Sequence, residues 1–272
     1  MIRGVFLTNL CGTPRARVIR FAVMRTPLLF VAALALVAFP VHAQETVAAD
    51  SGRFIVFQGS VPVAHENFAF QWMGDSLLIT ALCQRTLLDE QGGRHPFRKS
   101  LSMVVDSRDL GLTRYTSVQE FQGHTLTRGL VPGDTSITYF GELDGGGNAM
   151  RLAQPPGRLY VMDSQLFSLF EVLCRSLAPK TFAMRRVQLL ALSDSMTTPL
   201  ATVTLRKPDT LRVGSRRVPT KHYTFADESV SFELWADDRG RMMRLTHDES
   251  ELHVEREPDA PTPVRRRARG AR

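Results

Sequence analysis

The sequence lacks the partner residues that its one esterase-like motif would need. Gly74-Asp75-Ser76-Leu77 spells the four letters that name a broad family of serine esterases and lipases. A serine nucleophile needs a base and an acid that orients the base, which that family supplies from an Asp-x-x-His pair. No Asp-x-x-His sequence occurs in this chain. Because Met-Gly-Asp-Ser has the composition of a hairpin turn, we interpret Ser76 as a turn residue rather than a nucleophile.

Other catalytic or ligand-binding motifs are also incomplete. His65-Glu66 begins like a zinc-protease helix, but the second histidine is missing. The run 145–147 is three glycines without the Lys-Ser/Thr of a phosphate-binding loop, so it is interpreted as a flexible loop. His247 and His253 flank a predicted hairpin, and two ligands at loose spacing are weak evidence for a metal. The sequence therefore predicts no catalytic residue, no metal site and no cofactor.

The central part of the chain has no excess of charge of one sign. The whole chain carries a formal net charge of +7, but residues 44–257 hold 24 basic and 26 acidic residues. A nucleic-acid-binding domain needs a basic face. We therefore expect no nucleic-acid partner.

The basic excess lies in two terminal segments. Residues 1–43 hold five arginines and no acid, and they include the uncharged stretch 27–40 followed by Val-His-Ala. This pattern predicts a signal peptide, starting at Met1 or Met24 and cleaved after Ala43, and hence a periplasmic or secreted bacterial protein. From Pro258 the chain is proline-rich and then arginine-rich, which predicts a disordered tail. Such a tail is either a solubilising segment or a site of attraction to an anionic membrane surface.

Between these ends the sequence predicts a single β-rich domain over residues 44–257, without linkers or repeats. Short apolar or alternating runs rich in Val, Phe, Thr, Leu and Tyr recur, as strands require. The predicted strands are Arg53–Gln58, Ala64–Trp72, Leu77–Leu88, Ser100–Asp106, Leu112–Phe121, His124–Val131, Ser136–Glu142, Phe182–Leu192, Ala201–Arg206, Arg216–Ala226, Val230–Ala236, Met242–His247 and Glu251–Arg256. Their short connections predict antiparallel pairing.

One segment has the periodicity of an amphipathic helix. Apolar side chains recur at helical spacing, and Pro179 ends the pattern. Asp163 is the expected N-cap. The apolar stripe is formed by Leu166, Leu169, Phe170, Leu173, Cys174 and Leu177. A lone apolar stripe among many strands predicts a helix that covers the concave face of a curved sheet.

Only two of the three cysteines lie beyond the predicted signal peptide. Cys83 falls in a strand that is apolar on both faces, and Cys174 falls on the stripe of the helix. In an oxidising compartment they either form a disulfide, contributing about 3–5 kcal/mol, or remain two buried thiols. The sequence leaves both alternatives open.

Three stretches resemble a family of uncharacterised bacterial periplasmic proteins built like the lipoprotein carriers of the envelope and related half-barrels. They are GRFIVFQGSVPVAHENFAF from Gly52, PPGRLYVMDSQLFSLFEVL from Pro155, and VGSRRVPTKHYTF with VSFELWADDRGRMMRL from Val213 and Val230. Residues 59–68 and 235–244 match turn and strand patterns of the family, although Ala64 stands where glycine is common. The resemblance implies a mainly β fold, a strongly curved antiparallel sheet (an open half-barrel) wrapped around one or two helices. It also implies that the concave face holds an acyl chain or another apolar ligand.

Two classes of function follow from these observations. The first is a non-catalytic envelope protein that binds a lipid or other apolar ligand. The second is a secreted hydrolase whose site the spacing does not reveal. A third possibility, apart from these two, is a structural component of the envelope. For the binding protein, the residues expected to line the cavity or the helix wall are Leu166, Leu169, Phe170, Leu173, Phe232 and Leu234.

Overall fold

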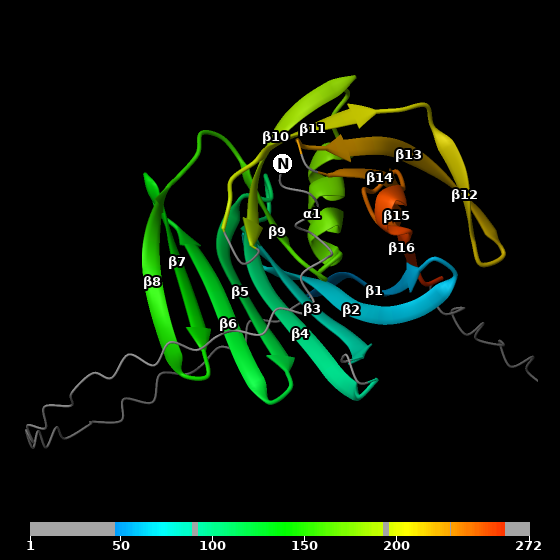
Figure 1. Cartoon of the computed structure of the whole chain (residues 1–272). Coiled ribbons are helices and arrows are strands. Elements are labelled where there is room, and N and C mark those ends of the chain that lie inside the picture. Colours follow the sequence, from blue (N-terminus) through cyan, green and yellow to red (C-terminus); the bar gives the residue numbers. More distant parts are fainter. Residues whose placement is uncertain (1–46, 89–91, 193–195, 229, 259–272) are drawn as a thin grey trace, which may run out of the picture.

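The computed structural model describes residues 47–88, 92–192, 196–228 and 230–258 (Figure 1). The predicted signal peptide, its cleavage site after Ala43, and the arginine-rich part of the predicted tail lie outside these residues. Within the described residues, no helix is both long enough and apolar enough to cross a membrane.

The chain forms one large sheet and one α-helix, as the alternating sequence pattern predicts. The elements are β1 (Val47–Gln58), β2 (Val61–Met73), β3 (Ser76–Leu88), β4 (Arg94–Asp106), β5 (Leu112–Phe121), β6 (His124–Pro132), β7 (Ser136–Leu143), β8 (Gly146–Ala153), β9 (Leu159–Asp163), α1 (Ser168–Leu177), β10 (Met184–Leu192), β11 (Leu200–Leu205), β12 (Asp209–Val213), β13 (Arg216–Ala226), β14 (Ser231–Ala236), β15 (Met242–His247), the 3₁₀ turn η1 (Asp248–Ser250) and β16 (Leu252–Arg256).

The sheet consists of two runs of neighbouring strands joined through the first and last strands. Its order is β8-β7-β6-β5-β4-β3-β2-β1-β16-β15-β14-β13-β11-β10-β9, and β12 pairs with β13 outside this path. All pairings are antiparallel except that of β9 with β10. Because β1 pairs with β16, segments about 200 residues apart lie side by side in the middle of the sheet.

The sheet is strongly curved and open, and α1 lies inside its curve (Figure 1). The strands from β9 to β16 and the first strands surround the helix, whereas β6, β7 and β8 extend to one side of it. This is the mainly β fold, with an open curved antiparallel sheet around a helix, that the family resemblance implies. Only one α-helix is present among the described residues.

The alternation of apolar residues correctly identifies the inner face. In β3, Leu77, Ile79, Ala81 and Cys83 are buried and the residues between them are not. In β14, Phe232 and Leu234 are buried in the same way. The inner residues and α1 form one hydrophobic core, as a sheet with one dry face requires.

Three strands were not predicted, and each lacks the alternation that the prediction used. The prediction of a flexible loop at 145–147 is wrong, because Gly146 and Gly147 begin β8 and pair with β7. β9 is buried along its whole length, so it reads as an unbroken apolar run. β12 pairs only with β13, in a short hairpin.

The helix begins later than predicted, and Asp163 is not its N-cap. Asp163 is the last residue of β9, and α1 runs from Ser168 to Leu177, just before Pro179. The carboxylate of Asp163 is instead directed at side chains of β4 and β5. Tertiary contacts have therefore overridden the local capping pattern.

Candidate ligand-binding site

The six residues predicted to line a ligand cavity come together between α1 and the sheet. Leu166, Leu169, Leu173, Phe232 and Leu234 are all at most 5% exposed. Phe170 is half-buried, and its ring packs against Phe225 and Phe232 at centroid distances of 6.0 and 5.3 Å. These side chains belong to one continuous hydrophobic core.

The space under the helix is filled by side chains. A void of about 10 Å³ lies between α1, where Leu169 lines it, and the sheet, where Met103 of β4 and Tyr160 of β9 line it. A void of this size holds one water molecule at most. The helix-covered half of the concave face is therefore packed as a core.

Glu66, on the inner face of β2, holds the N-terminus of α1. Its carboxylate accepts hydrogen bonds from the backbone N–H groups of Phe167 at 2.5 Å and Ser168 at 3.0 Å. These amides belong to the first turn of the helix, where they have no partner within the helix. Burial raises the pKa of Glu66 from 4.5 to about 7, against the opposing effect of these hydrogen bonds.

A second buried network fixes the middle of α1 to the sheet. The Glu171 carboxylate accepts from Arg175 at 2.5 Å and from Arg256 at 2.8 Å. Both guanidinium groups also pair with Asp50 of β1. Burial raises the pKa of Glu171, and the two arginines oppose this rise. Because Arg256 is in β16 and Asp50 in β1, the helix is tied to both strands at the centre of the sheet.

A third polar cluster surrounds Asp163 at the end of β9. Its carboxylate accepts from Lys99 at 2.5 Å, from Tyr115 at 2.5 Å and from Ser117 at 3.0 Å, and Nη1 of Arg128 lies 3.6 Å away. Burial lowers the pKa of Lys99, and the neighbouring Asp163 opposes this effect. The cluster connects β9 to the inner face of β4, β5 and β6 across the interior.

Beyond this cluster part of the inner face is exposed. The successive pairings of β5 with β6, β6 with β7 and β7 with β8 place one set of side chains on the same face as buried Tyr115. The apolar members of this set are Leu126, Leu130, Ile137, Tyr139, Leu143, Met150 and Leu152. Leu130 and Ile137 are fully buried, whereas Leu143 and Met150 are 52% and 44% exposed. We call the inner face of β6–β8 from Leu126 to Leu152 the open face.

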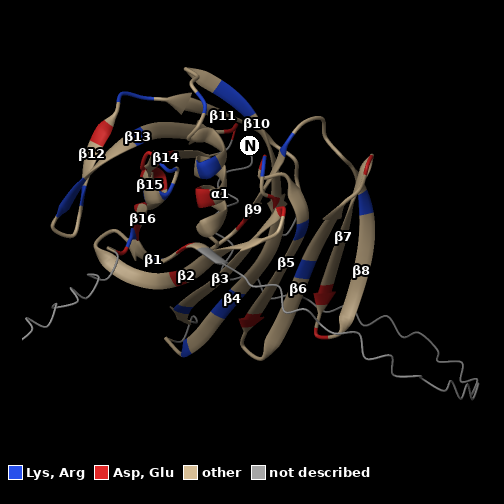
Figure 2. Ribbon diagram, turned by 180° about the vertical axis from the view of Figure 1, so that it is seen from behind, with Lys and Arg blue, Asp and Glu red and all other residues tan. Residues whose placement is uncertain are grey.

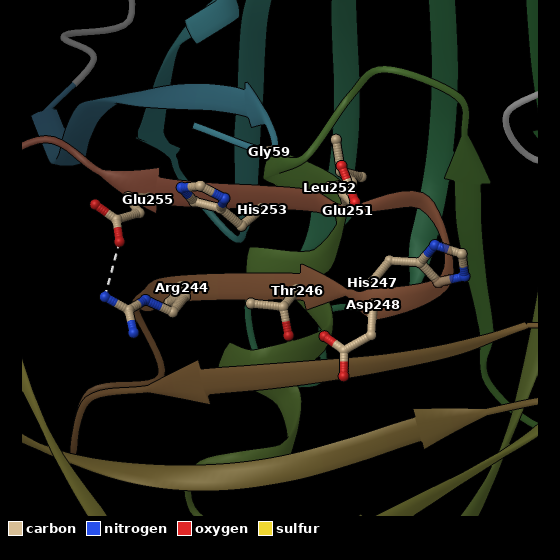
Figure 3. Close-up of a pocket in the computed structure, with 9 residues that line it drawn as sticks. All are labelled: Gly59, Arg244, Thr246, His247, Asp248, Glu251, Leu252, His253 and Glu255. Carbon is tan, nitrogen blue, oxygen red and sulfur yellow. Dashed lines mark hydrogen bonds and ion pairs between the residues drawn. The ribbon is translucent and has the colours of Figure 1, made fainter. Parts of the chain in front are cut away.

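A hollow also lies on the other side of the sheet. A shallow pocket of about 450 Å³ lies over β15 and β16, lined by residues that include Arg244, Asp248, Glu251, His253 and Glu255 (Figure 3). Arg244 pairs with Glu255 at 2.7 Å, and His253 stacks on Phe57. Its lining is mostly polar and charged, unlike that of an apolar-ligand site.

The two histidines of this hairpin both line the pocket, but their side chains lie on opposite faces of the sheet. His253 is opposite Thr246 in the register, so the adjacent His247 has its side chain on the other face of the sheet. The His247 ring packs at 5.0 Å from Phe232, an inner residue. Within the described part of the chain, no three His, Cys, Asp or Glu side chains are placed to hold a metal ion.

The other motif residues are structural. Gly74 and Asp75 form the turn between β2 and β3, and Ser76 pairs with Met73 at the start of β3. The interpretation of Ser76 as a hairpin residue is confirmed. His65 lies on β2 and shares a hydrogen bond with Gln84.

Cys83 and Cys174 are separate, buried thiols in the structure, so the proposed disulfide is not formed. Burial raises the pKa of the Cys83 thiol to about 12 and also raises the pKa of Cys174. Neither sulfur is a ready nucleophile, because the reactive form is the thiolate.

The sequence reasoning missed the charged residues of the inner face. Lys99 and Arg128 occur in strands, where single charges suggest the solvent side. Their position in the strand alternation could have identified them. Lys99 falls on the same face of β4 as Leu101, Met103 and Val105. Figure 2 shows charged residues interspersed along many strands. The register is what places Lys99 and Arg128 on the inner face.

Comparison with known proteins supports the fold only. No protein-family model matches the chain, and no curated protein matches it. The structure is similar to the crystal structure of a β-barrel-like protein of a domain of unknown function (DUF1849) from Brucella abortus. The TM-score is 0.50 and the sequence identity 8%, and the match covers 78% of this chain and 97% of the other.

Proposed function

We propose that this protein is a non-catalytic binding protein of the bacterial cell envelope that holds a lipid or another elongated apolar ligand. The observation that carries the proposal is the open face, where apolar side chains line a concave surface that α1 does not cover. The ligand lies against β6–β8, and α1 with its core residues is the fixed support of that surface. The predicted signal peptide supports a location outside the cytoplasm.

The packing around α1 favours the open face over the space under the helix. Opening the covered half requires the separation of a core that includes Leu169 and Leu173, at about 1.5–3 kcal/mol for each large apolar side chain. It also requires the breaking of the Glu171 and Glu66 contacts. Binding on the open face requires neither, because Leu143 and Met150 are already exposed.

A charge placed on the open face tests the proposal. Met150→Asp should weaken the binding of a neutral apolar dye such as N-phenyl-1-naphthylamine, or of a neutral lipid that displaces it, by about 10-fold. The matched control is Ala149→Asp, since Ala149 is the exposed neighbour on the other face of β8. Fluorescence titration measures both, and the control should bind like the wild type.

Two results would contradict the proposal. One is a wild-type protein that binds none of a panel of apolar dyes, fatty-acid esters and phospholipids. The other is equal binding by Met150→Asp and Ala149→Asp, which would place any bound ligand elsewhere.

A further inference from the structure

The charges of the inner face do not balance where the covered half meets the open face. Lys99 and Arg128 lie beside a single carboxylate, that of Asp163. One oxygen of Asp163 accepts from Lys99 at 2.5 Å, and the other accepts from the hydroxyls of Tyr115 and Ser117. Arg128 is farther away, at 3.6 Å. The carboxylate is committed to Lys99 and the two hydroxyls, so Arg128 contributes a positive charge without a close counter-ion.

Arg128 also has unused donors. Its contacts with Asp163 and with the carbonyl oxygen of Leu192, at 3.5 Å, are both made by Nη1. In the part of the chain that the structure describes, Nε and Nη2 have no hydrogen-bond partner. The side chain is only 12% exposed, and a guanidinium group remains charged at physiological pH. A mostly buried cation with free donors is stabilised by an anion that completes its hydrogen bonds.

The register places small and polar residues beside Arg128 and apolar residues around them. Gly141 is directly opposite Arg128 on β7, and Asn148 is opposite Gly141 on β8. A Cβ atom at Gly141 would lie 2.7 Å from the hydroxyl oxygen of Tyr139, so this hydroxyl lies over the glycine. The open face therefore has a polar spot containing a guanidinium, a phenol and an amide, with Leu126 and Met150 next to it along the strands.

We infer that Arg128 binds the carboxylate of a long-chain fatty acid whose hydrocarbon chain lies on the open face. This inference rests on the proposed function and specifies its ligand. The planar fork of a guanidinium donates two parallel hydrogen bonds to a carboxylate. One uncompensated positive charge matches the single negative charge of a fatty acid.

The test compares a fatty acid with its own methyl ester on the purified full chain. The fluorescent probe is cis-parinaric acid, titrated at pH 8, where its carboxyl group is ionised. The wild type should bind the acid about 10-fold more tightly than the ester. Arg128→Gln should lower the affinity for the acid about 10- to 100-fold and leave the affinity for the ester unchanged.

The matched control is Arg151→Gln, which removes the same charge from the outer face of β8. It should change the affinity for neither probe, which excludes a general effect of net charge. Arg128→Lys keeps the charge without the planar fork, and it should give an intermediate affinity for the acid. Because this variant keeps the aliphatic stem and the positive charge beside Asp163, it provides the test if circular dichroism shows that Arg128→Gln does not fold.

The outcomes separate this inference from the proposed function. If acid and ester bind the wild type equally, the carboxylate is not recognised and the inference fails, while the binding function stands. If neither binds, the proposed function fails and the inference with it. If lysophosphatidic acid of the same chain length displaces the probe at lower concentration than the fatty acid does, the site recognises phosphate, and the carboxylate assignment is overturned.

Discussion

Glu66 is the residue on which the position of α1 depends most directly. It is fully buried, and its carboxylate takes the place of an N-cap side chain by accepting two backbone N–H groups of the helix start. The sequence alone did not predict this role, because His65-Glu66 resembles the start of a metal-binding motif. Its phase with Phe68 and Phe70 is the feature that places it on the inner face.

The raised pKa of Glu66 makes stability depend on pH. Its pKa is about 7 in the folded protein against 4.5 when unperturbed, so the folded state binds the proton more tightly. This proton-linked stability is complete below pH 4.5 and is lost as the pH rises through 7. Glu66→Gln resembles the protonated form, so it should gain stability relative to the wild type between pH 5 and pH 8, by about 3 kcal/mol.

Urea unfolding at pH 5, 6.5 and 8 measures this difference. Glu120→Gln is the control, because Glu120 is an exposed strand residue whose side chain is 55% accessible. The control should show no trend of comparable size. A constant difference between Glu66→Gln and the wild type across the three pH values would mean that Glu66 does not titrate in this range.

At the scale of elements, α1 is a packed part of the core. Phe170 is the half-buried member of its apolar stripe and contacts Phe225 and Phe232. Phe170→Ala should lower the free energy of unfolding by about 2–3 kcal/mol, less than the 3–5 kcal/mol of a fully buried phenylalanine. Denaturant unfolding measures this loss.

The same variant distinguishes the open face from a site beside the helix. If the ligand lies on β6–β8, a saturating fatty-acid ester should raise the melting temperature of Phe170→Ala and of the wild type by the same amount. A smaller ligand-induced shift in the variant would indicate that Phe170 contacts the ligand.

Strands in which buried and exposed residues alternate could be predicted from the sequence. Strands whose conformation depends on their pairing partner could not. β3 and β14 each have one buried and one partly exposed face, which is visible in their sequences. β8 is mostly exposed and starts with two glycines, so its local propensity is low and its pairing with β7 determines its conformation. β9 is wholly buried and pairs in parallel with β10, a contact that no short-range pattern encodes.

At the scale of the whole molecule, the Asp163 cluster joins one end of the sheet, β9, to strands β4 and β5, which are far from it in the strand order. β9 is the last strand of the sheet, yet Asp163 contacts Lys99 of β4 and Tyr115 of β5 through the interior. The curl of the sheet is therefore fixed by a buried ion pair as well as by apolar packing. The removal of one partner of such a pair leaves the other charge buried without a counter-ion.

Asp163→Ala should destabilise the protein by about 3–5 kcal/mol, because Lys99 remains buried and unpaired. The double variant Lys99→Met with Asp163→Leu should recover most of this loss, since both charges are removed together. Thermal or denaturant unfolding of the three proteins measures the coupling. Equal losses in the single and double variants would show that the cluster acts through shape rather than charge.

The sequence by itself determined the fold class, the helix and its apolar stripe, and most of the strands. These features depend on short-range periodicity, because side chains alternate along a strand and recur every three or four residues along a helix. It also predicted that Ser76 belongs to a hairpin turn, since the chain has no Asp-x-x-His pair, and the structure places Ser76 in the hairpin of β2 and β3. Only the tertiary structure decided which part of the concave face is filled and which is open. The partners of Glu66, Asp163 and Arg128 lie on distant strands, and their pairing is set by register and curvature, which no local pattern contains.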